Sequence, residues 1–283
     1  MFEFYLENEN GAIVNINDAS RYAVIKADGL NPPSASLFTA KSPNRKGSKH
    51  NGSTLDERVI TLTIRLRGDI EANRNALYEW VETEQYVKVR YRNGLKNVYA
   101  EGYVQDCPID LFTEQEEVVV TILCGDPYWK DLQEIVTDIS NTLSLFKFPF
   151  AIDSEGVPFS TVRDSNTTRV FNDGAETGII IRIRCKGDIK NFTFYNANDT
   201  TQIFSLKTTL AAGWLVEIDT DGTPKRCRAI LADGSTINLV KYISGRPTWF
   251  TLKKGNNLFG YTAESGLDNA EVSISFVNKY TGV

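Results

Sequence analysis

Histidine, cysteine and carboxylate side chains are the groups in this 283-residue chain that are best suited to catalysis or metal binding. The only histidine, His50, lies in the polar stretch TAKSPNRKGSKHNGST at residues 39–54. Catalysis by a Ser-His-Asp or Cys-His arrangement requires a histidine that is held rigidly against its partners. A single histidine in a stretch without large apolar side chains does not meet this requirement, so the sequence argues against histidine-based catalysis.

The cysteines and the acidic clusters give no sign of a metal or catalytic site. No two cysteines have C-x-x-C spacing, and each lies in or beside an apolar run such as VVVTILCG or IIIRIRCK, so we expect four buried thiols in a reducing compartment. The acidic clusters DTDG (219–222) and TEQEE (113–117) fall at predicted turns or strand edges. There is no P-loop and no dinucleotide-binding glycine motif. We therefore expect no catalytic residues, no cofactor, no metal and no enzymatic activity.

Aromatic residues near the C-terminus suggest an alternative function, the binding of carbohydrate. In PTWFTLKKGNNLFGY (247–261), Trp249 and Tyr261 are candidates for stacking on a sugar, which would make the chain a carbohydrate-binding module. The same segment is predicted to form a hairpin, with Phe250 and Leu252 on one face and a turn at KKGNN. Gly255 would supply a positive φ in that turn.

Composition narrows the class of protein further. Hydrophobic residues make up 41% of the chain and charged residues 24%, which predicts compact cores. The formal net charge of −5 argues against a dedicated nucleic-acid binder. No run reaches the ~18 apolar residues that cross a membrane, and the N-terminus has no basic and apolar leader, so we expect neither membrane insertion nor general secretion.

Strand patterns dominate the elements that must position these residues. FEFYLE, VITLTIRLRG and EVSISFVN alternate apolar and polar side chains, and Asn10-Gly11 marks an opening hairpin. One helix is predicted near 70–83, with Asp69 as its N-cap and Leu77, Trp80 and Val81 on one face. The pattern predicts a mainly β chain with a first domain at 1–132, a connector at 133–147 and an antiparallel β-sandwich at 148–283.

The stretch at residues 39–54 is the only strongly basic segment. It contains Lys41, Arg45, Lys46 and Lys49 and no acid, and we interpret it as a long loop joining two strands. Two readings stay open, a solvated hairpin tip or an arm that orders against an acidic neighbour on assembly. We hypothesise that the four basic residues are assembly contacts with a neighbouring subunit or an adjoining ring.

Three stretches, in this order, resemble the distal tail protein family of long-tailed bacteriophages and phage-tail-like particles. They are LDERVITLTIRLRGD with the following helix, then VVVTILCGDPYW, and finally TWFTLKKGNNLFGY with VSISFVNKYTGV. The resemblance covers most of the chain. It implies an N-terminal split β-barrel with one packed helix, similar to tail-tube proteins, and a galectin-like C-terminal sandwich.

The resemblance also implies a structural role in the virion tail, after assembly in the bacterial cytoplasm. Family members form a homo-hexameric ring at the baseplate or tail tip and leave a channel for DNA in transit. The implied partners are the tail tube protein, the tail-tip or tail-associated protein, the tape measure protein and a receptor-binding protein. The alternative is a carbohydrate-binding module that contributes to host-surface adsorption.

Overall fold

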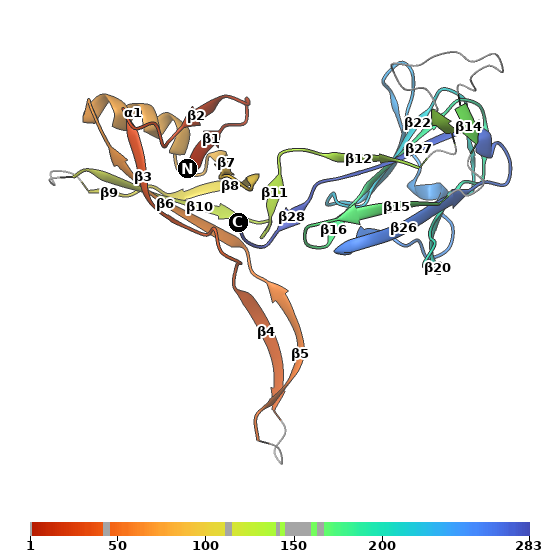
Figure 1. The fold of residues 1–283 in the computed structure, drawn as a ribbon, viewed down its shortest axis with the longest axis horizontal. Coiled ribbons are helices and arrows are strands. Elements are labelled where there is room, and N and C mark those ends of the chain that lie inside the picture. The colour runs from red at the N-terminus through yellow and green to blue at the C-terminus, as the bar shows by residue number, and fades with distance from the viewer. Residues whose placement is uncertain (1, 42–45, 111–114, 140–141, 145–159, 163–166) are drawn as a thin grey trace, which may run out of the picture. The chain divides into compact units, whose positions relative to one another are not determined.

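The chain is mainly β, with antiparallel sheets and a single α-helix among the residues described here. The computed structural model describes residues 2–41, 46–110, 115–139, 142–144, 160–162 and 167–283. It divides into two compact units (Figure 1). Unit 1 comprises Met1–Leu132 and Lys279–Val283, and unit 2 comprises Gln133–Asn278.

Unit 1 is built on one large sheet whose main path runs β2-β1-β7-β8-β10-β6-β3. Its strands are β1 (Glu3–Glu7), β2 (Ile13–Asn15), β3 (Tyr22–Asp28), β6 (Arg58–Leu66), β7 (Tyr86–Arg92), β8 (Asn97–Asp106), β9 (Ile109–Asp110), β10 (Glu117–Cys124), β11 (Trp129–Asp131) and β28 (Lys279–Tyr280). Alternation in β6 buries Ile60, Leu62 and Ile64 on one face, as its sequence predicts. The opening hairpin is confirmed by the β1–β2 pairing.

The predicted helix is present as α1 (Ile70–Val81). Asp69 caps it by accepting a hydrogen bond from the Ala72 backbone N–H at 3.1 Å. Leu77 and Val81 are buried in the core of unit 1, and Trp80 packs against that core. The amphipathic pattern therefore identified both the helix and the face that it buries.

The basic stretch is more ordered than a loop. β4 (Ala35–Lys41) and β5 (Ser48–Leu55) pair antiparallel from Ala35↔Leu55 to Lys41↔Ser48, with a bulge after Phe38. We call this hairpin the arm, and Figure 1 shows it extending from the sheet of unit 1. Every residue of β4 is exposed, as is every residue of β5 except Gly52. The loop prediction was correct about exposure but wrong about regularity, because strand pairing satisfies the backbone without a core.

Unit 2 packs two sheets on one hydrophobic core. The six-stranded sheet consists of β12 (Ile135–Asp138), β27 (Ala270–Phe276), β17 (Ile180–Cys185), β22 (Leu215–Asp219), β23 (Arg226–Ile230) and β24 (Thr236–Asn238). The four-stranded sheet consists of β15 (Thr167–Asn172), β26 (Gly255–Thr262), β19 (Thr193–Asn196) and β20 (Asp199–Ser205). Inward residues such as Ile181, Ile274 and Phe194 are fully buried between them.

Short paired segments and two 3₁₀ turns complete unit 2. They are β13 (Thr142–Ser144) with β14 (Ser160–Val162), β16 (Thr177–Gly178) with β25 (Thr251–Leu252), β18 (Ile189–Lys190) with β21 (Thr209–Leu210), η1 (Val240–Tyr242) and η2 (Leu267–Asn269). The hairpin predicted at 247–261 is wrong, because β25 pairs with β16 whereas β26 pairs with β15 and β19. Gly255 does adopt a positive φ of 94° at this corner.

The two units differ from the expected domains in two places. The expected connector at 133–147 contains β12, which pairs with β27 along Ile135↔Phe276 to Asp138↔Ser273 and so belongs to the sheet of unit 2. The expected sandwich at 148–283 includes Lys279–Val283, which lie in unit 1 because β28 pairs with β11. Pairing between strands so far apart in the sequence cannot be predicted from the residues of either strand alone.

Candidate assembly surfaces

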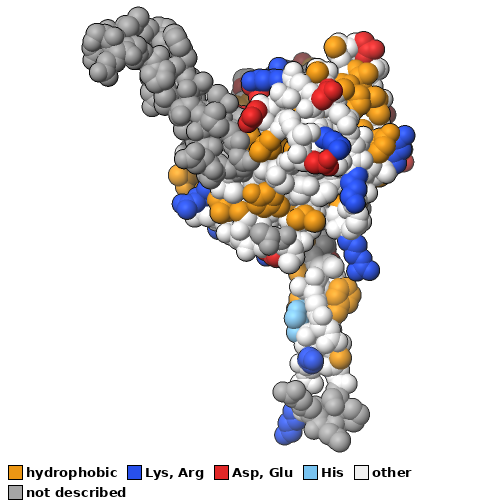
Figure 2. All heavy atoms as spheres, turned by 90° about the vertical axis from the view of Figure 1, so that its right-hand side faces the viewer, with side chains coloured by type: hydrophobic (Ala, Val, Ile, Leu, Met, Phe, Trp, Pro, Cys, Tyr) orange, Lys and Arg blue, Asp and Glu red, His pale blue; other side chains and the backbone are white. Residues whose placement is uncertain are grey.

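The arm carries most of the sequence-predicted contact residues. Lys41, Lys46 and Lys49 are exposed, and none forms an ion pair with another described residue. Arg45, the fourth candidate, lies outside the described residues. His50, the only histidine of the sequence, lies on β5 of the arm opposite Thr39, and Figure 2 shows hydrophobic and basic side chains on the arm. Among the described residues, none holds the exposed His50 side chain by a hydrogen bond or an ion pair, whereas a catalytic base needs a rigid partner.

Sequence reasoning missed the apolar side chains of the arm. Leu37 is 65% exposed, Phe38 55% and Leu55 39%. Large apolar side chains on a segment that packs on no described core are a mark of an interaction surface. The available signal was the pair Leu37-Phe38 just before the polar stretch, which predicts strand but cannot show whether a core covers it.

Two open sheet edges are a second candidate surface in unit 1. Among the described strands, β2 pairs only with β1, and β3 pairs only with β6. Each edge presents unpaired backbone groups, and such edges favour pairing with another chain. Exposed Ile13 on β2 and Ile25 on β3 add apolar surface at these edges.

The aromatic pair proposed for sugar stacking does not form an exposed platform. Tyr261 is 1% exposed, and its ring stacks on Phe192 at a centroid distance of 5.8 Å inside the core of unit 2. Trp249 is half-buried and packs edge-on against Phe204. A sugar needs an open ring face, so Tyr261 is a core residue rather than a glycan contact.

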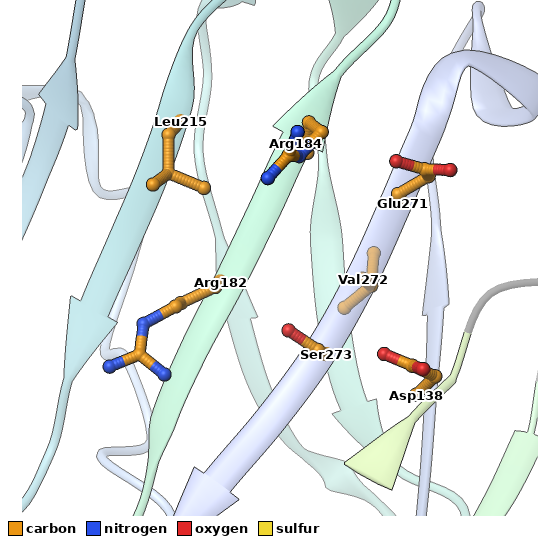
Figure 3. Close-up of a pocket in the computed structure, with 7 residues that line it drawn as sticks. All are labelled: Asp138, Arg182, Arg184, Leu215, Glu271, Val272 and Ser273. Atoms are coloured by element: carbon orange, nitrogen blue, oxygen red, sulfur yellow. The ribbon is translucent and has the colours of Figure 1, made fainter. Parts of the chain in front are cut away.

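A shallow groove on the outer face of the six-stranded sheet gathers several charged groups. Figure 3 shows Arg182 and Arg184 from β17, Asp138 from β12 and Glu271 from β27 around a volume of about 370 Å³. Arg182 already donates to Ser275 Oγ at 2.7 Å and to Glu134 Oε1 at 3.2 Å. Because the opposite charges largely cancel, the groove does not select a ligand of one sign.

The structure gives no support to acid–base or metal chemistry in the part of the chain that it describes. No group of three or more His, Cys, Asp or Glu is placed to hold a metal ion there. In DTDG, Asp219 Oδ1 accepts from the Asp221 and Gly222 backbone N–H groups, which makes it a turn residue. Of TEQEE, 113–114 lie outside the described residues, and Glu117 forms an ion pair with Arg65. No described helix is long and apolar enough to span a membrane.

Arg58 connects the first two stretches that carry the family resemblance. Its side chain is 1% exposed, and its guanidinium donates to the carbonyls of Pro127 and Asn31, each at 2.9 Å, and to that of Thr281. The ring of Trp129 lies 5.5 Å from the guanidinium carbon. LDER and CGDPYW therefore meet at one buried arginine. Sequence reasoning missed this residue. The available signal was that Arg58 alternates in phase with the buried residues Ile60 and Leu62 of β6.

Comparison with known proteins supports what the ordered stretches indicate. The family described as phage tail protein RIFT-related domain matches residues 10–124, and the siphovirus-type tail component, C-terminal domain, of the SPP1 Dit type, matches residues 174–280. The chain belongs to the distal tail protein family. The two matches fall in unit 1 and unit 2 respectively and together span well over half of the chain.

Solved structures share the fold of this distal tail protein. The crystal structure of SPP1 Dit, described as a paradigm of the hub adsorption apparatus in phages that infect Gram-positive bacteria, aligns with a TM-score of 0.71. Its identity is 14%, and the alignment covers 98% of this chain and 99% of that one. Chains of the activated phage p2 baseplate with Ca and with Sr align with TM-scores of 0.54 and 0.51, each at 11% identity and 100% coverage of both chains. No curated protein matches the sequence.

Membership of this family makes the chain a structural component of a phage tail. The family assignment and the mainly β fold expected from the sequence are confirmed. The split-barrel and galectin-like descriptions stay predictions, as do the contact roles of Lys41, Lys46 and Lys49.

Proposed function

We propose that the protein is a distal tail hub, a homo-hexameric ring that joins the tail tube to the tail tip and leaves a channel for DNA. The observation that carries this proposal is the match of both units, in order, to tail-component families. Similar structures include SPP1 Dit, described as a hub of an adsorption apparatus, and chains of a phage baseplate.

Features of unit 1 fit a ring-forming role. A chain with two open sheet edges can satisfy both by pairing with neighbours on either side, which a closed ring does for every subunit. The net charge of −5 suits a lumen through which DNA slides, since each contact with a phosphate would add salt-dependent affinity. The axial partners are then the tail tube protein, the tape measure protein and the tail-tip protein, with a receptor-binding protein on the outside.

The position in the particle can be tested directly. Purified tails labelled with gold-conjugated antibody against unit 2 should carry gold at the end distal to the capsid. Tails from a phage that lacks the gene, complemented with a tagged copy, give the matched control for antibody specificity. Gold distributed along the tube, or absent from intact tails, would contradict the proposal.

A further inference from the structure

A groove at the end of α1 has no occupant within the described chain. It has a volume of about 500 Å³. Its apolar lining comes from Tyr78, Val81 and Cys107, and its charged lining comes from Glu79 and Glu82. Both glutamates are exposed, and neither forms an ion pair with a described residue.

The helix end and two glutamates give this groove a negative charge. Backbone carbonyls at the C-terminus of a helix carry a partial negative charge, which basic side chains normally offset. The last turn of α1 contains no basic residue, whereas Glu79 lies within it and Glu82 is the C-cap. These carboxylates add to the field of the helix rather than offsetting it. A cation that binds there is favoured by both contributions.

The arm presents the complementary chemistry. Its register places Phe38 opposite Gly52 and Ala40 opposite Lys49. Side chains of a strand alternate between faces, so Phe38, Ala40 and Lys49 lie on the same face of the arm. Because Gly52 has no side chain, the ring of Phe38 is left uncovered, and it is 55% exposed. One face of the arm therefore offers an aromatic ring with a cation beside it.

We propose that the arm of one copy docks in the α1 groove of a second copy, with Phe38 in its apolar part and Lys49 beside its two glutamates. Figure 1 shows α1 and the arm at opposite ends of unit 1, so one chain does not pair with itself. Contacts between different surfaces repeat head to tail and generate rings or filaments. This inference rests on the proposed ring, for which it names the subunit contact.

Native Cys107 permits a direct test by cross-linking. In an Ala40→Cys variant, mild oxidation joins the two sulfurs as a disulfide only if the arm of one copy reaches the groove of another; the oxidant accepts the two electrons and the two thiol protons are released. We expect a ladder of covalent oligomers on a non-reducing gel. The double variant with Cys107→Ser should give none. Assembled rings without a ladder above this control would overturn the docking and leave the hub function intact.

A charge exchange tests the ionic part of the contact. Lys49→Glu alone and Glu82→Lys alone should each weaken self-association about fivefold, and the combined variant should restore it. Glu9→Lys, at an exposed glutamate of the β1–β2 turn, is the matched control for net charge. Unchanged association in both single variants, or no recovery in the combined one, would contradict the docking.

The same variants separate the docking from the hub function. If the arm cysteine cross-links to the tail tube protein instead of a second copy, the arm has a different occupant and the inference is wrong. If the wild-type chain stays monomeric even with the tail tube protein, the ring and the docking both fail. If all variants assemble as the wild type does, only the docking fails.

Discussion

Burial sets the reactivity of individual thiols in this protein. Cys124, Cys185 and Cys227 are buried, whereas Cys107 is half-buried at the end of β8. Burial raises the pKa of Cys107 to about 11 and that of Cys124 to about 12. The thiolate is the nucleophile, so both access and ionisation limit alkylation.

We therefore predict that iodoacetamide modifies only Cys107 in the folded, unassembled chain. The modification should be slower than for a free thiol at pH 8 and should accelerate as the pH rises toward 11, because more thiolate forms. Peptide mass spectrometry gives the modified positions, with the urea-unfolded chain as the control that reacts at all four. Rapid modification of Cys124 or Cys227 under native conditions would show that the described burial is incorrect.

Glu101 belongs to a polar cluster on the sheet of unit 1. Its carboxylate accepts from Lys130 Nζ at 2.8 Å and from the Tyr86 hydroxyl at 3.0 Å. Burial by itself raises the pKa of Glu101, but the hydrogen bond and charge of Lys130, with the bond from Tyr86, outweigh it and lower the pKa. Burial, followed by the hydrogen bond to Glu101, raises the pKa of Tyr86.

This depressed pKa predicts a pH-dependent effect of Glu101→Gln. A carboxylate whose folded pKa lies below its usual value of about 4.5 stabilises the fold above that value, and the contribution is lost as the pH falls further. Because the side chain is 37% exposed, we expect a loss of only about 1 kcal/mol at pH 7. The stabilities of wild type and variant from urea unfolding should converge as the pH falls below about 4.5, with Glu9→Gln as an exposed control. A difference that is independent of pH would contradict this account.

At the scale of elements, periodic patterns predicted what local physics determines. The strands β1, β6 and β27 and the helix α1 appear where alternation or amphipathicity predicted them. The sequence did not predict three elements. The strand β12 and the corner at β25 depend on pairing partners far along the chain. The arm depends on backbone pairing between two strands that pack on no described core. The candidate lysines were identified from their charge. The place of Phe38 on the same face as Lys49 follows only from the strand register.

Because β8 lies close to β10, we predict that substitution of two glycines by alanine has very different effects on stability. A Cβ on Gly102 would lie 2.2 Å from the Leu123 carbonyl oxygen, whereas a Cβ on Gly94 would meet nothing within 4 Å. Gly102→Ala must therefore move backbone, and we expect it to cost about 3 kcal/mol of unfolding free energy. Gly94→Ala, the matched control, should change it by less than about 0.5 kcal/mol. Thermal unfolding measures both, and equal stabilities would contradict the register of these strands.

At the scale of the whole molecule, residues 279–283 stabilise unit 1, whose other residues are 1–132. β28 pairs with β11, the Val283 N–H donates to the Leu30 carbonyl at 2.9 Å, and Arg58 donates to the Thr281 carbonyl. Unit 1 thus contains two separate stretches of the sequence, and the residues of unit 2 lie between these stretches in the sequence. Stability of unit 1 then depends on residues that follow unit 2.

Deletion of residues 279–283 should destabilise unit 1 selectively. Losing the Thr281 carbonyl and the β28 pairing should cost about 3 kcal/mol and lower the melting temperature of unit 1 by roughly 10 °C. The core of unit 2 contains none of these residues, so its transition should not move. Calorimetry separates the transitions, with Thr281→Ala, which keeps the carbonyl, as the control. A shift of the unit 2 transition instead would contradict the division.

The most direct test of the hub proposal is the solution mass of the purified protein, measured by light scattering with negative-stain images of the same fraction. A hexamer of 31.7 kDa chains has a mass of about 190 kDa and should appear as a ring with a central hole. Where the purified chain alone is monomeric, the measurement is repeated with the tail tube protein, on which the ring should then close. A chain that remains at 31.7 kDa under both conditions would contradict the hub proposal.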